Sequence, residues 1–117
     1  MAKELKSEPI SIYAVTKKYG GGTFNRFGIR LNPTGGYAVG CLSHSIVVPN
    51  EKSEVENAFR TLAKEVEIIG TWIDPADGNV YVDHIYIVEN LADALTAGRI
   101  YKQFCIYDFA NGVTIKC

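Results

Sequence analysis

The nine-residue run VYVDHIYIV at positions 80–88 constrains the fold of this chain more than any other segment. β-Branched and aromatic residues dominate the run, and apolar side chains occupy both alternating sets of positions. Such residues favour extended structure, and a strand that is apolar on both sides is typical of the interior of a sheet. The run therefore predicts a central strand, so the rest of the chain has to supply a strand on each side of it and elements that bury its apolar side chains.

Turn residues predict the neighbours on the C-terminal side. The segment 74–79 reads DPADGN, and its Asp-Gly pair predicts a hairpin between residues 71–73 and the central strand. A second hairpin is predicted at 104–109 and 113–115, because Asn111-Gly112 between these runs is a favoured two-residue turn. We expect the last of these strands to lie at the edge of the sheet.

The N-terminal half predicts further strands. Alternating apolar residues indicate strands at 10–15, 26–31 and 37–42, with the apolar residues of 26–31 on one buried side. Glycine-rich turn residues between the last two runs predict a hairpin. A short edge strand is expected at 45–48, and Pro49 ends it because proline cannot donate a backbone hydrogen bond.

Two helices are expected between these strands. Ser53 and Glu56 have the spacing of a reciprocal capping pattern, which predicts the start of the first helix. The apolar stripe of that helix comprises Val55, Phe59, Leu62 and Val66. Asn90 predicts the cap of a second helix with small residues on one face. The sequence thus predicts an α+β fold, an antiparallel sheet of about five to seven strands with two helices packed on one face, and a strongly closed barrel is the alternative.

Size and composition limit the domain organisation. The 117 residues are 47% apolar, which is enough for one core, so we expect a flexible N-terminal arm over 1–8 and a single α+β domain over 9–117. Neither a membrane-spanning stretch nor a secretory signal is recognisable. The three cysteines, an odd number, indicate reduced thiols, and a cytoplasmic protein without membrane contact is expected.

Charge is unevenly distributed along the chain. Residues 1–50 contain six basic and two acidic side chains, whereas residues 51–117 contain six basic and eleven acidic ones. Either the two halves attract each other within the fold, or a basic face steers an anionic partner. That face would comprise Lys17, Lys18, Arg26 and Arg30. A basic N-terminal hairpin with tyrosines could stack single-stranded nucleic acid, but the acidic remainder argues against a nucleic-acid partner.

Metal and cofactor sites are weakly signalled. Cys41 and His44 have a C-x-x-H spacing, and His84, Cys105 and Cys117 are the remaining candidate ligands. Structural zinc sites usually take their ligands as two close pairs, and only one pair is present. The acidic turn at 74–79 lacks the acidic twelfth position of a calcium loop. We therefore expect neither a metal nor a cofactor.

Catalytic groups do not form a recognisable constellation either. A nucleophile at Cys41 with His84 and Asp83 is unfavourable, because Asp83 and His84 are neighbours in a predicted strand and point to opposite faces. The carboxylates available for acid-base chemistry are Asp74, Asp83, Glu89 and Asp108. A small hydrolase or nuclease that uses carboxylates and a histidine therefore stays open as an alternative, and we favour a non-enzymatic protein.

Several strings along the chain, in their order and spacing, resemble a family of small uncharacterised proteins encoded by bacteriophages and mobile elements. The resemblance covers roughly residues 20–109. The strings are Gly21-Gly22-Thr23-Phe24-Asn25, Thr34-Gly35-Gly36-Tyr37-Ala38-Val39-Gly40, Gly70-Thr71-Trp72-Ile73-Asp74, Val80-Tyr81-Val82-Asp83, and Ala94-Leu95 through Gly98-Arg99 to Gln103-Phe104-Cys105-Ile106-Tyr107-Asp108. The resemblance implies a cytoplasmic protein made in a bacterial host, and it transfers no catalytic residue.

These observations favour a small binding module that modulates or inhibits a host or defence protein. Tyrosine and tryptophan are frequent, and such side chains are enriched in recognition surfaces. The candidate binding residues are Tyr37, Trp72, Asp74, Tyr81, Asp83, Gln103 and Asp108. A homodimer is a further expectation, because an exposed edge strand at 113–116 can pair with its copy.

Overall fold

The computed structural model describes residues 11–117, except for the side chains of Leu42 and Ser43. The predicted arm at 1–8 lies outside the described residues. The elements are α1 (Ile12–Tyr19), β2 (Gly21–Asn25), β3 (Tyr37–Val48), α2 (Lys52–Ala63), β4 (Ile68–Ile73), β5 (Val80–Val88), α3 (Leu91–Ile100), β6 (Cys105–Asp108) and β7 (Val113–Lys116). The strands form one antiparallel sheet in the order β2-β4-β5-β3-β6-β7, so the predicted α+β class is confirmed.

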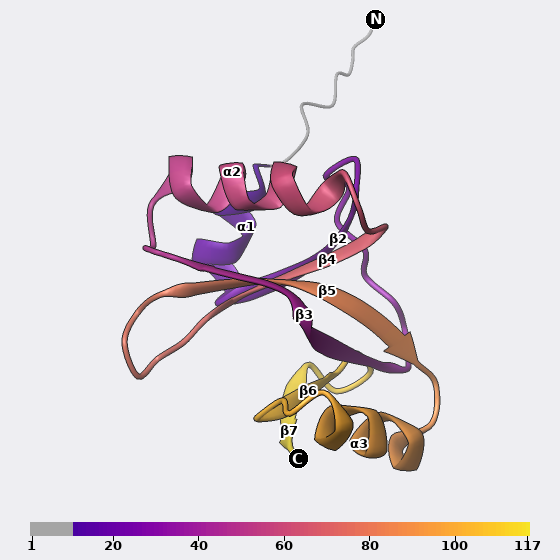
Figure 1. The fold of residues 1–117 in the computed structure, drawn as a ribbon. Coiled ribbons are helices and arrows are strands. Elements are labelled where there is room, and N and C mark those ends of the chain that lie inside the picture. The colour runs from indigo at the N-terminus through magenta and orange to yellow at the C-terminus, as the bar shows by residue number, and fades with distance from the viewer. Residues whose placement is uncertain (1–10) are drawn as a thin grey trace, which may run out of the picture.

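The central position predicted for residues 80–88 is also confirmed. β5 lies between β4 and β3 and pairs with both over most of its length. Its long partner β3 pairs with β6 only at Tyr37 and Ala38, and its register with β5 shifts between Cys41 and Ser45. Such an irregularity bends the strand and increases the twist of the sheet. The sheet consequently curls, with the β6–β7 hairpin turned away from the plane of β2 and β4 (Figure 1).

The three described helices cover one face of the curled sheet at its two ends. Val80 and Val82 of β5 pack with Val55 and Phe59 of α2, in a core cluster that also takes in α1. Val88 lies an even number of residues after Val80 and Val82 on β5, and it packs against a second cluster under α3. Because alternate residues of a strand share a face, both clusters lie on the same face of β5, and the coil of the sheet places α2 and α3 at opposite ends of the molecule (Figure 1).

The prediction of a strand at 10–15 is wrong, because residues 12–19 form helix α1. Alternation at Ile12 and Ala14 suggested a strand, but the buried residues are Ile12, Val15 and Thr16, which have helical spacing. The Ser11 side chain caps the helix by accepting from the Ala14 N–H, and Gly20 ends it with a positive φ of 81°. Residues 11–117 therefore contain one helix more than predicted.

The predicted strand at 26–31 and its hairpin with 37–42 are also wrong. Asn25 Oδ1 accepts the backbone N–H groups of Phe27 and Ile29, so the chain turns here instead of extending. Phe27 is 80% exposed and Ile29 61% exposed, so neither side chain is buried as expected. Strand β2 lies earlier, at Gly21–Asn25, where no strand is predicted, and it pairs with β4.

Two further expectations need correction. Residues 45–48 are not a separate strand but continue β3, which ends before Pro49 as predicted. Helix α2 begins at Lys52 after Glu51, which makes no side-chain cap, so Ser53 lies inside the helix. Glu56 reaches another helix instead, because its Oε2 accepts the Ser11 hydroxyl at 2.6 Å. Val55, Phe59 and Leu62 form the buried stripe of α2 as predicted, but Val66 is buried beyond the helix, which ends at Ala63. The Asn90 cap of α3 and the edge position of β7 are confirmed.

None of the helices in the described part of the chain has the length and hydropathy required to cross a lipid bilayer.

Candidate functional site

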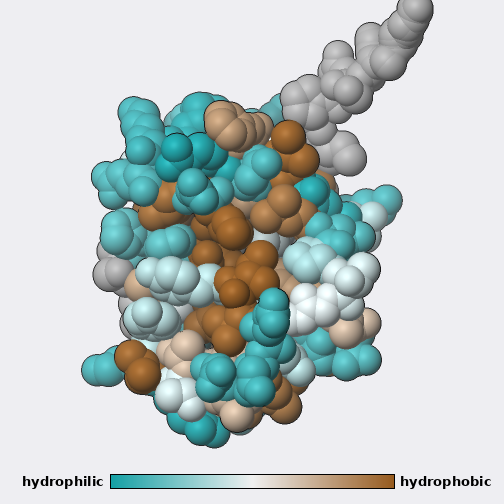
Figure 2. Space-filling view, turned by 90° about the vertical axis from the view of Figure 1, so that its right-hand side faces the viewer, coloured by the Kyte–Doolittle hydropathy of each residue, from teal (hydrophilic) through white to brown (hydrophobic). Residues whose placement is uncertain are grey.

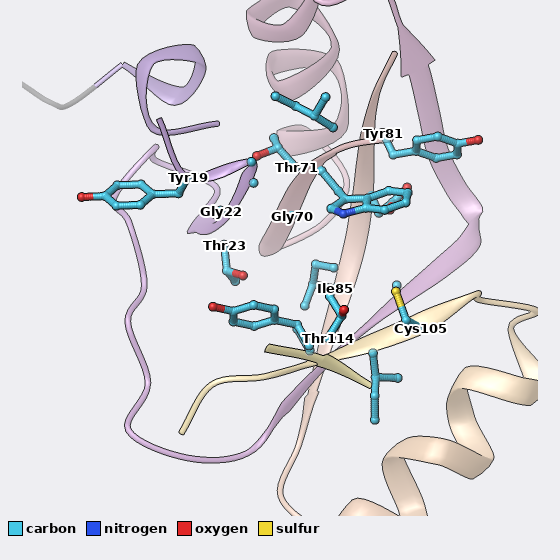
Figure 3. A pocket seen from close by; sticks show the side chains of 18 of the residues that line it. Tyr19, Gly22, Thr23, Gly70, Thr71, Tyr81, Ile85, Cys105 and Thr114 are labelled. Carbon is cyan, nitrogen blue, oxygen red and sulfur yellow. The ribbon is translucent and has the colours of Figure 1, made fainter. Parts of the chain in front are cut away.

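The face of the sheet opposite the helices is hollowed into a groove of about 680 Å³. Side chains from β2, β4 and β5 line one side of this groove, and the α3–β6 connection and the β6–β7 hairpin line the other. Figure 3 shows Tyr19 and Tyr81 at opposite margins, Ile85 between them, and Cys105 and Thr114 contributed by the C-terminal strands. The volume lies in the range of sites that bind ligands.

Glycines at three points of the sheet allow close packing at the groove. A Cβ at Gly21 would lie 2.5 Å from the Thr71 carbonyl oxygen, so β2 approaches β4 more closely than a larger residue permits. At Gly70 and Gly40 the space above the backbone is taken by the side chains of Ile85 and Gln103. The groove floor is therefore formed by backbone and by a few side chains from neighbouring strands.

Aromatic rings form the walls. Trp72 and Tyr81 are cross-strand partners on β4 and β5, with ring centroids 5.8 Å apart. On the other side, Tyr107 of β6 and Phe109 pack edge to face at 5.5 Å. All four residues line the groove. Aromatic side chains arranged in this way provide large contact areas with little conformational entropy to lose on binding.

The positively charged side chains of Lys18 and Arg30 lie against Tyr19 at the margin of the groove. The Arg30 guanidinium lies over its ring at 4.4 Å and the Lys18 ammonium at 5.2 Å. Lys18, and after it Arg30, lower the pKa of the Tyr19 hydroxyl because both stabilise its ionised form. Tyr19 and Arg30 both line the groove, so this margin is basic.

Asp83 places a carboxyl group in the interior of the groove. The Ser45 hydroxyl, which lies opposite on β3, donates to Asp83 Oδ1 at 2.5 Å. Burial raises the pKa of this carboxyl from 3.8 to about 6, and the Ser45 hydrogen bond offsets only part of that rise. The carboxyl group is therefore mostly ionised at neutral pH although water is largely excluded from it.

Gln103 reaches the same region from the end of α3. Its backbone N–H donates to the Gly98 carbonyl at 2.8 Å, and the Lys102 N–H donates to the Arg99 carbonyl. This is a Schellman ending, and its left-handed position is occupied by Lys102, with a φ of 59°, where glycine is usual. Lys102 and Gln103 both line the groove.

The structure brings together four of the seven residues proposed from sequence. Trp72, Tyr81, Asp83 and Gln103 all line the groove. The other three lie elsewhere. Tyr37 packs against the cluster under α3. Asp74 Oδ1 accepts the Ala76 N–H in the β4–β5 turn, and Asp108, 5% exposed, accepts backbone N–H groups of the β6–β7 turn.

Sequence reasoning did not select several residues that shape the groove. These are Tyr19, Gly40, Ser45, Lys102 and Tyr107. The chain contains seven tyrosines, and nothing in the local sequence distinguishes Tyr19 and Tyr107 from core tyrosines. Gly40 and Ser45 were assigned only to strands. Lys102 has the left-handed backbone conformation that glycine usually provides after a helix, and a lysine does not mark that position in the sequence.

The two histidines lie together on the opposite face of β5. The ring centroids of His44 and His84 are 5.7 Å apart, and His44 Nε2 is 3.6 Å from Glu65 Oε1. Burial, and secondarily the charge of His44, lower the pKa of His84. His84 Nδ1 is buried and makes no hydrogen bond within the described structure. Asp83 and His84 therefore do face opposite ways, as expected from strand alternation.

The arrangement bears on the enzymatic and metal-binding hypotheses. Asp74 and Asp108 stabilise turns and Asp83 lines the groove, so within residues 11–117 these carboxylates do not converge on a histidine. Among the side chains that the structure describes, no group of three histidine, cysteine, aspartate or glutamate residues is arranged to hold a metal ion. Cys41, Cys105 and Cys117 form no disulfide.

The basic residues of the N-terminal half do not form one hairpin. Lys17 and Lys18 lie in the last turn of α1, and Arg26 Nε donates to the Val66 carbonyl near α2.

Figure 2 shows the side of the molecule that lies at the right of Figure 1, where apolar residues gather in a band bordered by polar ones. The groove on the face of the sheet without helices, called the helix-free groove below, is lined by aromatic, acidic and basic side chains together.

Comparisons of this chain with family models, with curated proteins and with solved structures found no match.

Proposed function

We propose that this protein is a non-enzymatic binding module whose helix-free groove takes a segment of a partner protein. The partner we propose is a host or defence protein of a bacterium, in line with the resemblance described above to proteins encoded by bacteriophages and mobile elements. The observation that carries the proposal is the position of Asp83, a largely buried carboxyl group among aromatic rings that are not needed for the helix-covered core.

Exposed aromatic residues at the margin support a macromolecular partner. Phe104 is 76% exposed and Tyr19 56% exposed, and both line the groove. Large aromatic side chains that stay exposed in a folded chain commonly mark an interaction site. A partner segment that covers them buries apolar area in addition to whatever it places inside the groove.

A selection from a displayed library of random peptides tests the proposal. Trp72 is the only tryptophan of the chain and lines the groove, so its fluorescence reports on occupation of the site. We expect enriched peptides to change this fluorescence and to lose most of their affinity for a Tyr81→Ala variant. A Tyr13→Ala variant, altered on the helical side of the molecule, is expected to bind them normally.

Two results would contradict the proposal. The first is a selection that enriches no peptide on the intact protein. The second is a set of enriched peptides that bind the Tyr81→Ala and Tyr13→Ala variants equally well and leave the Trp72 fluorescence unchanged. Circular dichroism of both variants serves as the control that the fold is retained.

A further inference from the structure

The Asp83 carboxyl group has no basic partner in the described part of the chain. Its hydrogen bond comes from a neutral hydroxyl, that of Ser45, and no lysine or arginine contributes to its electrostatic environment. Ionised carboxylates that are removed from water are normally paired with a cation, because the loss of hydration is otherwise uncompensated. A carboxylate without an ion-pair partner, in a groove open to ligands, points to a cation that the ligand supplies.

A second acceptor lies beside the carboxyl group. A Cβ built at Gly40 would be 2.6 Å from Gln103 Oε1 and 3.4 Å from Asp83 Oδ2, which places these two oxygens no more than about 6 Å apart. Gln103 Nε2 is turned away, since it donates to the Tyr101 carbonyl at 3.3 Å. Two acceptor oxygens therefore converge above Gly40, and a group with several N–H donors can reach both.

The aromatic wall next to these oxygens distinguishes between cations. Tyr81 is two residues before Asp83 on the same face of β5, and Trp72 packs against it. A guanidinium group is planar, carries five donors and stacks on aromatic faces, whereas an ammonium group is a compact and strongly hydrated point charge. The combination of two separated acceptors and an aromatic wall fits a guanidinium better.

If the proposed function is correct, the geometry points to an arginine side chain of the partner as the group that enters the groove. Its guanidinium donates to Asp83 Oδ2 and Gln103 Oε1, and its flat face lies against the wall formed by Trp72 and Tyr81. Arg30 and Lys102 line the same groove, so neighbouring basic residues in the partner are disfavoured. The segment recognised is therefore a single arginine with acidic or neutral neighbours.

Three small amides test this inference without knowledge of the partner. The probes are the N-acetyl amides of arginine, citrulline and lysine, added to the 117-residue chain while the Trp72 fluorescence and indole N–H resonance are followed. Citrulline has the shape of arginine but no charge. We expect the arginine amide to bind at least about tenfold more tightly than the citrulline amide, because a charge-assisted hydrogen bond to a carboxylate is lost in the neutral analogue.

Matched variants assign the effect to Asp83. Asp83→Asn keeps the size of the side chain and an acceptor for the Ser45 hydroxyl, so we expect it to fold and to bind the arginine and citrulline amides equally weakly. Asp77→Asn removes the same charge from the exposed β4–β5 turn, outside the groove lining. We expect this control to retain the tenfold preference for arginine.

The inference is overturned by equal affinities for arginine and citrulline amides, by tighter binding of the lysine amide, or by an Asp83→Asn variant that keeps the preference. These results are separable from failure of the proposed function. If displayed peptides bind at Tyr81 but the amides show no preference for arginine, the groove is a binding site and only the identity of the recognised group is wrong.

Discussion

The two faces of the sheet use the same strands for different purposes. On the helix-covered face, Phe24, Ile69 and Val82 are completely buried and contact other apolar side chains. On the groove face, the same strands present Trp72, Tyr81 and Asp83, which no helix covers. The covered face stabilises the fold through burial of apolar area, whereas the groove face keeps half-buried rings and a largely buried carboxylate, which contribute little to stability.

Strand β5 shows how closely these roles are interleaved. Val80 and Val82 contact α2, while the intervening Tyr81 and the following Asp83 line the groove. Because successive side chains of a strand alternate between faces, one extended run supplies both the core and the candidate site. A residue's role in this molecule therefore follows from its face more than from its position along the chain. The substitutions below test that separation, from the largest expected effect to the smallest.

Phe24→Ala is expected to cause the largest loss of stability. Phe24 is 0% exposed and packs edge to face against Phe59, with ring centroids 5.8 Å apart. Its truncation leaves a cavity between β2 and α2, so the free energy of unfolding should fall by about 3–5 kcal/mol. Urea denaturation followed by circular dichroism measures the change.

The matched substitution on the groove face is Tyr81→Ala. Tyr81 is only half-buried, so we expect a loss of about 1 kcal/mol or less. If Tyr81→Ala destabilised the protein as much as Phe24→Ala, the groove wall would be part of the core, and the proposed division between the faces would be wrong.

Asp83→Asn is expected to increase stability at neutral and alkaline pH. The pKa of Asp83 is about 6 in the folded protein against 3.8 ordinarily, so the folded state binds a proton more tightly than the unfolded state. The carboxylate therefore destabilises the fold progressively as the pH rises from about 4 to about 6. Replacement by a neutral amide should raise the free energy of unfolding by up to about 3 kcal/mol at about pH 8.

The same variant should lose its advantage in acid. Near pH 3 Asp83 is protonated in both states, so the two proteins should be equally stable there. Urea denaturation of both proteins across this pH range gives the difference directly, and other titrating groups cancel in it. An Asp83→Asn variant that is less stable than the original at about pH 8 would mean that the carboxylate has a stabilising partner within the fold.

Gly21→Ala tests the close approach of strands at the groove. The added Cβ would lie 2.5 Å from a backbone oxygen of Thr71, and a backbone atom cannot move aside as a side chain can. We expect β2 to shift and the free energy of unfolding to fall by about 1–3 kcal/mol. Gly35→Ala is the control, because a Cβ there meets nothing within 4 Å and its φ is not positive. Equal stability of the two variants in urea would contradict the role given to Gly21.

The parts of the fold that could be predicted are those with local signals. The β4–β5 hairpin, the Asn90 cap and the β6–β7 turn each depend on a few consecutive residues whose chemistry favours one backbone geometry. Helix α1 was missed because Ile12 and Ala14 fit both a strand and a helix. The helix is favoured by a contact between distant parts of the chain, because the capping residue Ser11 donates a hydrogen bond to Glu56, 45 positions away.

The candidate site could be predicted only in part for the same reason. Trp72, Tyr81 and Asp83 occupy alternating positions of one hairpin, so their common face follows from a correct turn. Gly40 and Gln103 meet only because the sheet curls and brings the end of α3 over β3. No pattern in the sequence specifies that curl, which depends on the irregularity in β3 between Cys41 and Ser45.

Lys102→Gly is expected to have the smallest effect and to separate stability from binding at one position. Lys102 has a left-handed backbone conformation, which glycine adopts without a steric penalty, so the free energy of unfolding should rise by about 0.5–1 kcal/mol. Lys102→Ala removes the same ammonium but keeps the unfavourable φ, and it should leave stability nearly unchanged. Both variants should weaken the binding of selected peptides that carry an acidic residue next to the arginine, because both remove a positive charge from the groove. Urea denaturation and Trp72 fluorescence titration measure the two effects separately. A Lys102→Gly variant that is less stable than the original would show that the lysine side chain itself supports the fold, and the α3–β6 connection would then belong with the covered face and not with the groove.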